Sequence, residues 1–205
     1  MFQTQTLESG LRVLTIPIKE IPSVSVLVLV KVGSRYEREK TNGLAHFTEH
    51  MLFQGNDKWP AKIDLAIAVD SVGAEYNGFT GKEYTGYSVK SESKNLPLAF
   101  DILSHMLWHS SFESAQIERE KPVILEEISY RHDTPQIAVT DLVTEMVFSG
   151  HPLGLSGAGE KEAVQKFQKE DFLKFHQSFY LCQNTLVIVA GKFENAEVAD
   201  LVSSH

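Results

Sequence analysis

The sequence predicts an α+β protein with a mostly antiparallel sheet of about six strands and helices packed on one face of that sheet. Two observations support this fold class. Strand-like runs occur in pairs, and helical patterns are grouped between those pairs instead of alternating with single strands. The chain has 205 residues, of which 42% are hydrophobic and 22% charged, so we expect residues 1–205 to form a single domain with one core.

The amino-terminal elements are expected to be strands. Residues 2–17 contain two strand-like runs around Glu8-Ser9-Gly10 and therefore predict a hairpin. The run from Val24 to Val32 is the most apolar of the chain. It is far shorter than the roughly 20 residues of a membrane span, so it is expected to be a buried strand.

The remaining elements follow from apolar spacing and from turn residues. In chain order they are a helix over about 43–54, a helix over 60–72, strands over 74–80 and 84–90 joined by Gly81-Lys82, helices over about 96–109, 114–131 and 135–148, a Gly/Pro-rich loop over 151–159, a helical stretch ending near Tyr180, a strand over 185–190 and a helix over 195–203.

Composition narrows the class of function. The net charge of −8 argues against a nucleic-acid surface. The single cysteine, Cys182, excludes an internal disulfide and is compatible with a reducing compartment. No secretory signal is recognisable at the amino terminus, so a cytoplasmic location is expected. The alternative is an organelle or the periplasm after processing.

The run His46-Phe47-Thr48-Glu49-His50 indicates a metal site. Two histidines four residues apart leave the same face of a helix, about one turn from each other, and can bind one Zn²⁺. Glu49 lies between them, where its carboxylate can take a proton from a water at the metal. This order, H-x-x-E-H, inverts the more common H-E-x-x-H protease motif. The simpler interpretation is a helix that carries these residues by chance.

The flanking residues favour a helix at this position. Thr41 and Asn42 offer N-cap oxygens, and Gly55 is a plausible C′ residue. In the later helix that begins near residue 114, Ser114 offers the corresponding cap.

A catalytic zinc site needs a third protein ligand, and two adjacent glutamates compete for this role. Glu127 lies on a half-apolar helical stripe with Glu120 two turns earlier, whereas Glu126 lies on a more polar face. We therefore predict Glu127 as the ligand and Glu120 as a helper that accepts a hydrogen bond from a ligand histidine. His105 and His109 repeat the spacing without a glutamate between them, and we interpret them as structural.

Several motifs together resemble the inverzincin peptidases of family M16, which includes pitrilysin, insulin-degrading enzyme and the mitochondrial processing peptidase. The similarity spans nearly the whole chain. The matching segments are Gly43 to Phe53 (the zinc helix), Asn77-Gly78-Phe79-Thr80 with Glu83-Tyr84-Thr85 (the strand pair beside the cleft), Glu120 to Glu127 (the distal glutamate helix) and His151-Pro152-Leu153-Gly154 with Phe179-Tyr180, Asn184 and the run over 187–191 (the close of the amino-terminal domain).

The resemblance implies a function and a fold. His46, His50 and Glu127 would hold one Zn²⁺ per chain, Glu49 would be the general base, and Glu120 would support the site. The fold would be the half-molecule shared by the mitochondrial processing peptidase and the LuxS metallohydrolases. The implied activity is zinc-dependent endopeptidase cleavage of peptides or unfolded polypeptides. The donor set suits Zn²⁺ but also tolerates Mn²⁺ or Co²⁺.

Substrate is expected to lie extended along the strand at 74–80 and to gain main-chain hydrogen bonds by strand addition. Asn77, Gly78 and Phe79 are the candidate substrate-binding residues. Asn77 could bond the peptide, although a turn-favouring role before Gly78 is equally consistent with the sequence. The family often has alanine where Gly78 stands.

Active members of the family pair this domain with a second, similarly folded domain or subunit, which closes a chamber and supplies an Arg/Tyr pair near the substrate carbonyl. The sequence offers no such pair beyond Ala190-Gly191. We therefore expect a second domain, a partner subunit or a homo-oligomer. The alternative function is a zinc-binding half that is inactive alone. A lyase acting on S-ribosylhomocysteine is a third interpretation; it would need a reactive cysteine, and Cys182 has no evident link to the metal motif.

Overall fold

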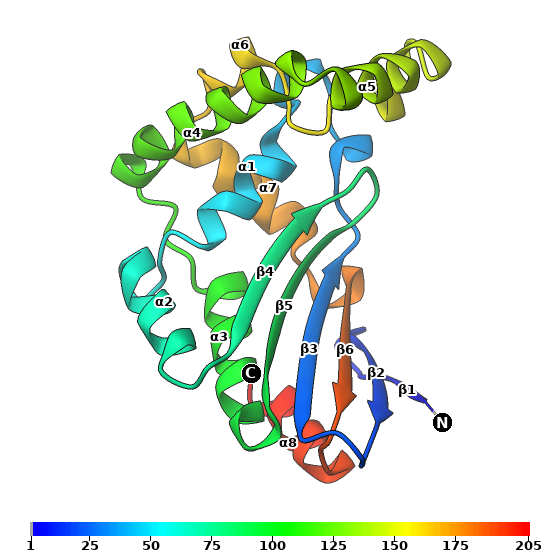
Figure 1. The fold of residues 1–205 in the computed structure, drawn as a ribbon, viewed down its shortest axis with the longest axis vertical. Helices are drawn as coiled ribbons and strands as arrows, with labels where there is room; N and C mark the ends of the chain where they lie inside the picture. The colour runs from blue at the N-terminus through cyan, green and yellow to red at the C-terminus, as the bar shows by residue number, and fades with distance from the viewer. Residues whose placement is uncertain (1) are drawn as a thin grey trace.

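One six-stranded sheet organises residues 2–205, the part of the chain that the computed structural model describes (Figure 1). Its strand order is β1-β2-β6-β3-β5-β4. The strands are β1 (Gln3–Thr6), β2 (Arg12–Pro17), β3 (Ser23–Val30), β4 (Glu75–Thr80), β5 (Thr85–Glu92) and β6 (Thr185–Gly191). All neighbours are antiparallel except β2 and β6, which run parallel. The predicted mostly antiparallel sheet is confirmed.

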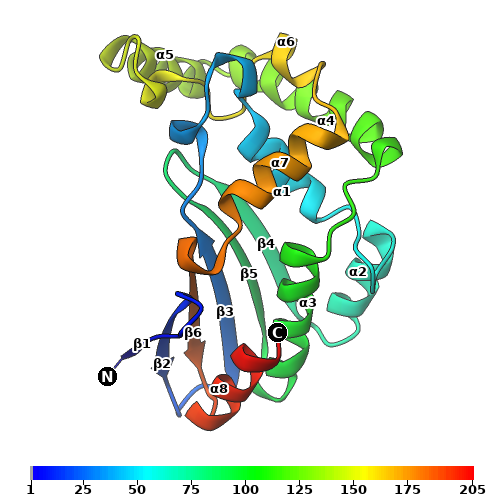
Figure 2. The same ribbon diagram turned by 180° about the vertical axis from the view of Figure 1, so that it is seen from behind.

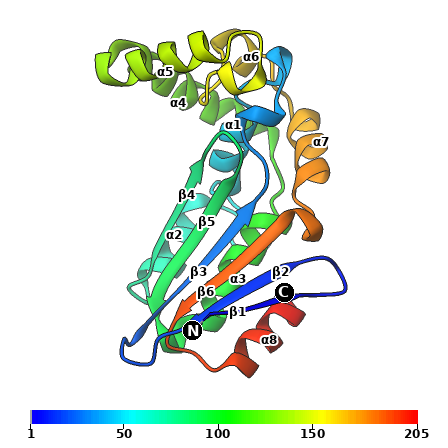
Figure 3. The ribbon, with the colours of Figure 1, turned by 90° about the vertical axis from the view of Figure 1, so that its right-hand side faces the viewer.

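The two faces of the sheet differ in burial because side chains alternate along each strand. In β3, Val26 and Val28 are buried, while Leu27 and Leu29 on the opposite face are half-buried. Figure 3 looks onto the strands with α2 and α3 behind them. The helices therefore cover one face, as the sequence predicts.

The helices match the predicted ranges to within a few residues. They are α1 (Leu44–Leu52), α2 (Lys62–Asp70), α3 (Leu96–Trp108), α4 (Ser114–Asp133), α5 (Pro135–Val147), α6 (Lys161–Val164), α7 (Lys169–Phe179) and α8 (Asn195–Ser204). Helices α4, α5 and α6 gather beyond one end of the sheet, while α3 packs against β3 and β5, and α8 contacts α3 (Figures 1 and 2). None of the helices within residues 2–205 combines the length and apolar character that a membrane span requires.

Helix α1 is held by its neighbours on three sides, since it contacts β4, α4 and α7. Phe47 on its buried face meets Phe172 of α7 edge-on, with ring centroids 4.9 Å apart. Both rings are fully buried, so this packing anchors the helix that carries the two histidines.

The predicted helix caps are wrong in detail. The N-cap of α1 is Gly43, with φ of 97°, and neither Thr41 nor Asn42 caps the helix with its side chain. Gly55 does have a positive φ, but α1 ends at Leu52, too early for Gly55 to be the C′ residue. Ser114 is the first residue of α4 rather than its cap. Cap identity depends on where the last turn of each helix closes, which tertiary packing decides.

Candidate metal centre

Helices α1 and α4 bring His46, His50 and Glu127 together. His46 Nε2 lies 3.4 Å from Glu127 Oε1, and His50 Nε2 lies 3.6 Å from Glu127 Oε2. One ligand atom from each of the three residues falls within 4.8 Å of the other two. Glu126, the competing candidate, is exposed.

The three side chains fit a divalent cation. Zinc bonds of about 2.0–2.2 Å in tetrahedral geometry separate neighbouring ligand atoms by roughly 3.3–3.6 Å. The observed separations of 3.4 and 3.6 Å match this range. Two imidazole nitrogens and a carboxylate form a donor set that suits Zn²⁺.

Glu120 orients one of the histidines. His50 Nδ1 donates to Glu120 Oε1 at 3.0 Å, which leaves His50 Nε2 with its lone pair on the side of Glu127. Gln54 Nε2 also donates to Glu120, at 2.7 Å. The Glu120 side chain is only 11% exposed, so these two donors hold a carboxylate that is nearly buried. Gln54 was not predicted from the sequence.

The pKa values of His46 and Glu127 are shifted by their contact with each other. Burial disfavours the charged form of His46, but the hydrogen bond and negative charge of Glu127 raise the pKa of His46 overall. The hydrogen bond from His46 lowers the pKa of Glu127, against the opposing effect of burial. Protonation of His46 and metal binding compete with each other, because a histidine ligand must be neutral.

Glu49 lies beside this group, on the same helix, and is half-buried. Its Oε2 accepts a hydrogen bond of 2.6 Å from Thr80 Oγ1, at the end of β4. The sequence does not predict this contact, because it joins residues 31 positions apart through the fold.

Glu37 is a second residue that the sequence did not predict. Its carboxylate accepts hydrogen bonds from the backbone N–H groups of Gly43 and Ala45, at 2.9 and 2.6 Å, and from Asn42 Nδ2 at 2.9 Å. Glu37 is 3% exposed, and burial raises its pKa. The Glu37 side chain therefore caps the N–H groups at the start of α1, the role that was predicted for Thr41 and Asn42.

The candidate substrate-binding residues lie on β4, which forms one edge of the sheet because it pairs only with β5. Asn77 and Phe79 are exposed, and Gly78 is half-buried. Asn77 Oδ1 accepts from the N–H of Gly78 at 2.9 Å, so this side chain bonds the backbone of the next residue. Within residues 2–205 no strand pairs with the outer side of β4, although the N–H of Gly78 is taken by Asn77.

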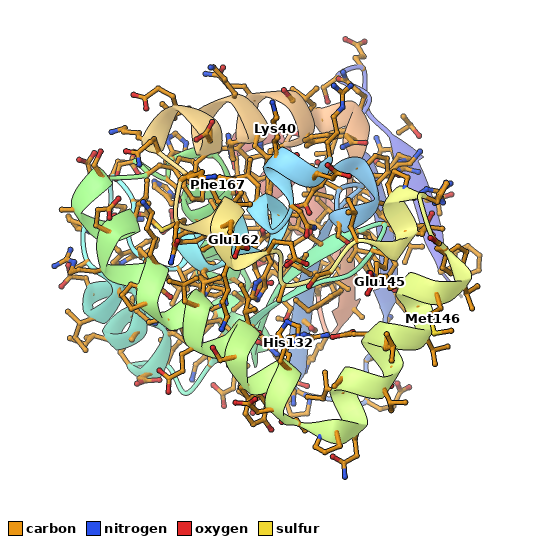
Figure 4. The ribbon with its side chains drawn as sticks, turned by 90° about the horizontal axis from the view of Figure 1, so that it is seen from above. Lys40, His132, Glu145, Met146, Glu162 and Phe167 are labelled. Atoms are coloured by element: carbon orange, nitrogen blue, oxygen red, sulfur yellow. The ribbon has the colours of Figure 1, made fainter. Side chains whose placement is uncertain are left out.

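A cavity of about 670 Å³ lies between α4, α5 and the loops before α1 and α6. Arg131, one turn after Glu127, lines it and donates through Nη2 to both oxygens of Asp141, at 3.0 and 2.9 Å. His132 and Glu145 also line the cavity, and Figure 4 shows them on α4 and α5 at this end of the molecule.

The second histidine pair does not join the metal centre. His105 Nδ1 donates to the backbone carbonyl of Asp101 at 2.9 Å, and His109 lies 3.3 Å from Asp57. Cys182 is half-buried in the turn before β6 and is not one of the residues grouped around a metal position in the described chain.

Comparison with known proteins gives consistent results. The sequence model of the insulinase family, peptidase family M16, matches residues 12–161. A protein of Rickettsia bellii named as an uncharacterised zinc protease is 34% identical over 197 residues, which cover 96% of this chain and 48% of that protein. The beta subunit of the mitochondrial-processing peptidase of Lentinula edodes is 34% identical over 203 residues, covering 99% of this chain and 43% of that subunit.

A solved structure shares the fold along the entire chain. The crystal structure of a protease from Helicobacter pylori superposes with a TM-score of 0.95 at 26% identity and covers 100% of this chain but 50% of its own. The chain thus spans about half the length of the proteins it matches.

Proposed function

The chain belongs to peptidase family M16, the insulinase family, and on this premise we propose that it is the zinc-binding domain of a metalloendopeptidase that hydrolyses peptides or unfolded polypeptides. The observation that carries the proposal is the approach of His46, His50 and Glu127 to within ligand distance of one another, beside Glu49. In this proposal the first three residues hold one Zn²⁺ and Glu49 is the general base.

A zinc ion bound there would lower the pKa of a water towards about 7 and polarise the peptide carbonyl. Glu49 takes a proton from the attacking water and passes it to the nitrogen of the leaving amine. Glu120 keeps the His50 ring in position through the Nδ1 hydrogen bond. The free edge of β4 binds the peptide backbone in an extended conformation, with Asn77, Gly78 and Phe79 beside it.

Replacement of Glu49 by glutamine tests the proposal. The variant should bind zinc like the wild type, while hydrolysis of an unstructured peptide should fall by roughly 10²–10⁴. Zinc content and peptide cleavage are measured on the same preparation, and wild-type cleavage should be lost with a chelator and restored by zinc. Undiminished hydrolysis by Glu49→Gln would rule out this base.

The alternative function is a zinc-binding half that has no activity until a partner domain or subunit joins it. The supporting observation is that the chain spans only about half of its relatives. In this case the residues above bind metal and peptide, and the partner completes the groups around the substrate carbonyl.

A further inference from the structure

We propose that Thr80 is a positioning residue for Glu49 and holds the carboxylate of the general base from the strand along which the peptide binds. The inference rests on the proposed function. Thr80 Oγ1 donates to Glu49 Oε2 at 2.6 Å, in a half-buried environment. Within residues 2–205 no other side chain donates a hydrogen bond to Glu49.

The other carboxylate oxygen also lies against β4. A Cβ atom added to Gly78 would fall 2.8 Å from Glu49 Oε1 and 2.8 Å from the ring of Phe53. Strand β4 therefore borders both oxygens of Glu49: the hydroxyl of Thr80 bonds Oε2, and Gly78, which has no side chain, leaves the space beside Oε1 open. The hydrogen bond from Thr80 restricts the rotation of the carboxylate, and a side chain at residue 78 would displace it.

Fixing this rotation matters because a glutamate side chain is flexible. A base that samples several rotamers spends little time in line with the proton it must remove, and a small displacement of a reacting group can lower a rate substantially. A charge-assisted hydrogen bond from a hydroxyl at 2.6 Å is short and strong enough to select one orientation.

The strand also links the base to the substrate. Side chains alternate along β4, so Gly78 and Thr80 face α1, while Asn77 and Phe79 face the opposite side. A peptide that pairs with the free edge of β4 orders the same backbone that carries the Thr80 hydroxyl. Peptide binding and alignment of the base thus depend on one strand.

The test compares Thr80→Ser with Thr80→Ala, because these two variants differ only in the hydroxyl. Thr80→Val adds an isostere of the native side chain, and Thr15→Val on β2 is a control for hydroxyl loss in a distant strand. Each variant is made in the whole zinc-loaded protein, with its second domain or subunit present. The kcat, the KM for an unstructured peptide, the zinc content and the melting temperature are measured.

We expect kcat to fall by about 10- to 100-fold in Thr80→Ala and Thr80→Val, as for the loss of a hydrogen bond to a charged group. KM should stay within about twofold, zinc content should be unchanged, and Thr80→Ser should retain kcat within about threefold. Thr15→Val should behave like the wild type.

An equal loss of kcat in Thr80→Ser and Thr80→Ala would overturn the proposal. Lower zinc content, or a higher KM with unchanged kcat, would also overturn it. Each of these results would indicate a purely structural role. If Thr80→Val does not fold, the serine and alanine pair decides. Zinc-dependent wild-type hydrolysis with unaffected Thr80 variants would reject the role of Thr80 alone. Absence of zinc-dependent hydrolysis in the wild type would reject the proposed function and this role together.

Discussion

At the scale of single residues, the position of the carboxylate decides which of the adjacent glutamates, Glu126 or Glu127, can bind the metal. Glu127 lies 3.4 Å from His46 and 3.6 Å from His50, whereas Glu126, one position earlier on the same helix, is exposed. We predict that Glu127→Gln lowers zinc affinity by at least about 100-fold, because a neutral amide is a poorer ligand. Glu126→Gln, which makes the same chemical change, should stay within about threefold. Competition with a chelating dye measures both, and equal losses would contradict the assignment.

Glu120 is predicted to strengthen zinc binding without being a ligand of the metal. Glu120→Gln should weaken zinc binding by about 10- to 100-fold, because the amide accepts more weakly from His50 Nδ1 and the ring is held less firmly. The loss should be smaller than that caused by Glu127→Gln. The same dye competition checks this order, and a reversed order would assign Glu120 a more direct role.

The residues of this centre differ in how far the sequence could predict them. Each of the three residues His46, His50 and Glu127 lies on a helix. The helical period predicts the face on which each side chain lies, so these residues could be selected from the sequence. Thr80 and Glu37 act on α1 from a strand and an irregular loop. No periodic pattern links such segments to the helix, because their contacts depend on the path of the chain.

At the scale of elements, helix α1 depends on a buried acidic cap. Glu37 accepts from the N–H groups of Gly43 and Ala45, which have no partner within the helix. We predict that Glu37→Gln lowers the free energy of unfolding by about 1–3 kcal/mol, because an amide oxygen replaces one carboxylate acceptor and the NH₂ group meets donors. Glu39→Gln, at an exposed position two residues later, should change it by less than about 0.5 kcal/mol. Denaturant unfolding measures both, and equal effects would contradict the cap.

Helix α7 carries a half-buried histidine, His176, from which we predict a pH dependence of stability. Burial lowers the pKa of His176, partly offset by its hydrogen bond to the carbonyl of Leu107. Between its lowered folded pKa and about 6.5, the unfolded chain binds the proton and the folded chain does not. Stability attributable to His176 is therefore lost as pH falls through about 6.5, by about 1.4 kcal/mol for each unit of pKa depression.

His176→Gln keeps an N–H donor and removes the titration, so its free energy of unfolding should fall less than that of the wild type between pH 8 and about 5.5. His132→Gln, at an exposed position of α4, serves as the control and should follow the wild-type profile. Denaturant unfolding at several pH values gives the comparison. Parallel curves for the wild type and His176→Gln would show that His176 does not titrate in this range.

At the scale of the whole molecule, the strands could be predicted but their order could not. Strand β6 inserts between β2 and β3, although more than 150 residues separate it from β3. Its alternation matches that of β3, since Val187 and Val189 pair with Val28 and Val26 on the buried face. Any strand with this two-residue period would satisfy the same pattern, so the sequence predicts a strand at 185–190 without predicting its neighbours.

The face of the sheet opposite α3 bears on whether this chain hydrolyses peptides without a second domain or subunit. Leu27 and Ile188 pair on the face opposite α3 and are only half-buried, and the chain covers about half of its relatives. We predict that the chain binds one zinc ion by itself, whereas peptide hydrolysis rises at least about tenfold when the second domain or subunit is added, because the partner would cover the substrate and exclude water.

The measurement is the initial rate of peptide cleavage as the second half is titrated against a fixed amount of this chain. The rate should saturate at a defined ratio of the two halves. Glu49→Gln in this chain should abolish the stimulated rate, because we propose Glu49 as the general base. A stimulated rate that survives Glu49→Gln would mean that the other half supplies the chemistry and that this half has a supporting role. Full activity without the second half would show instead that this domain is a complete peptidase.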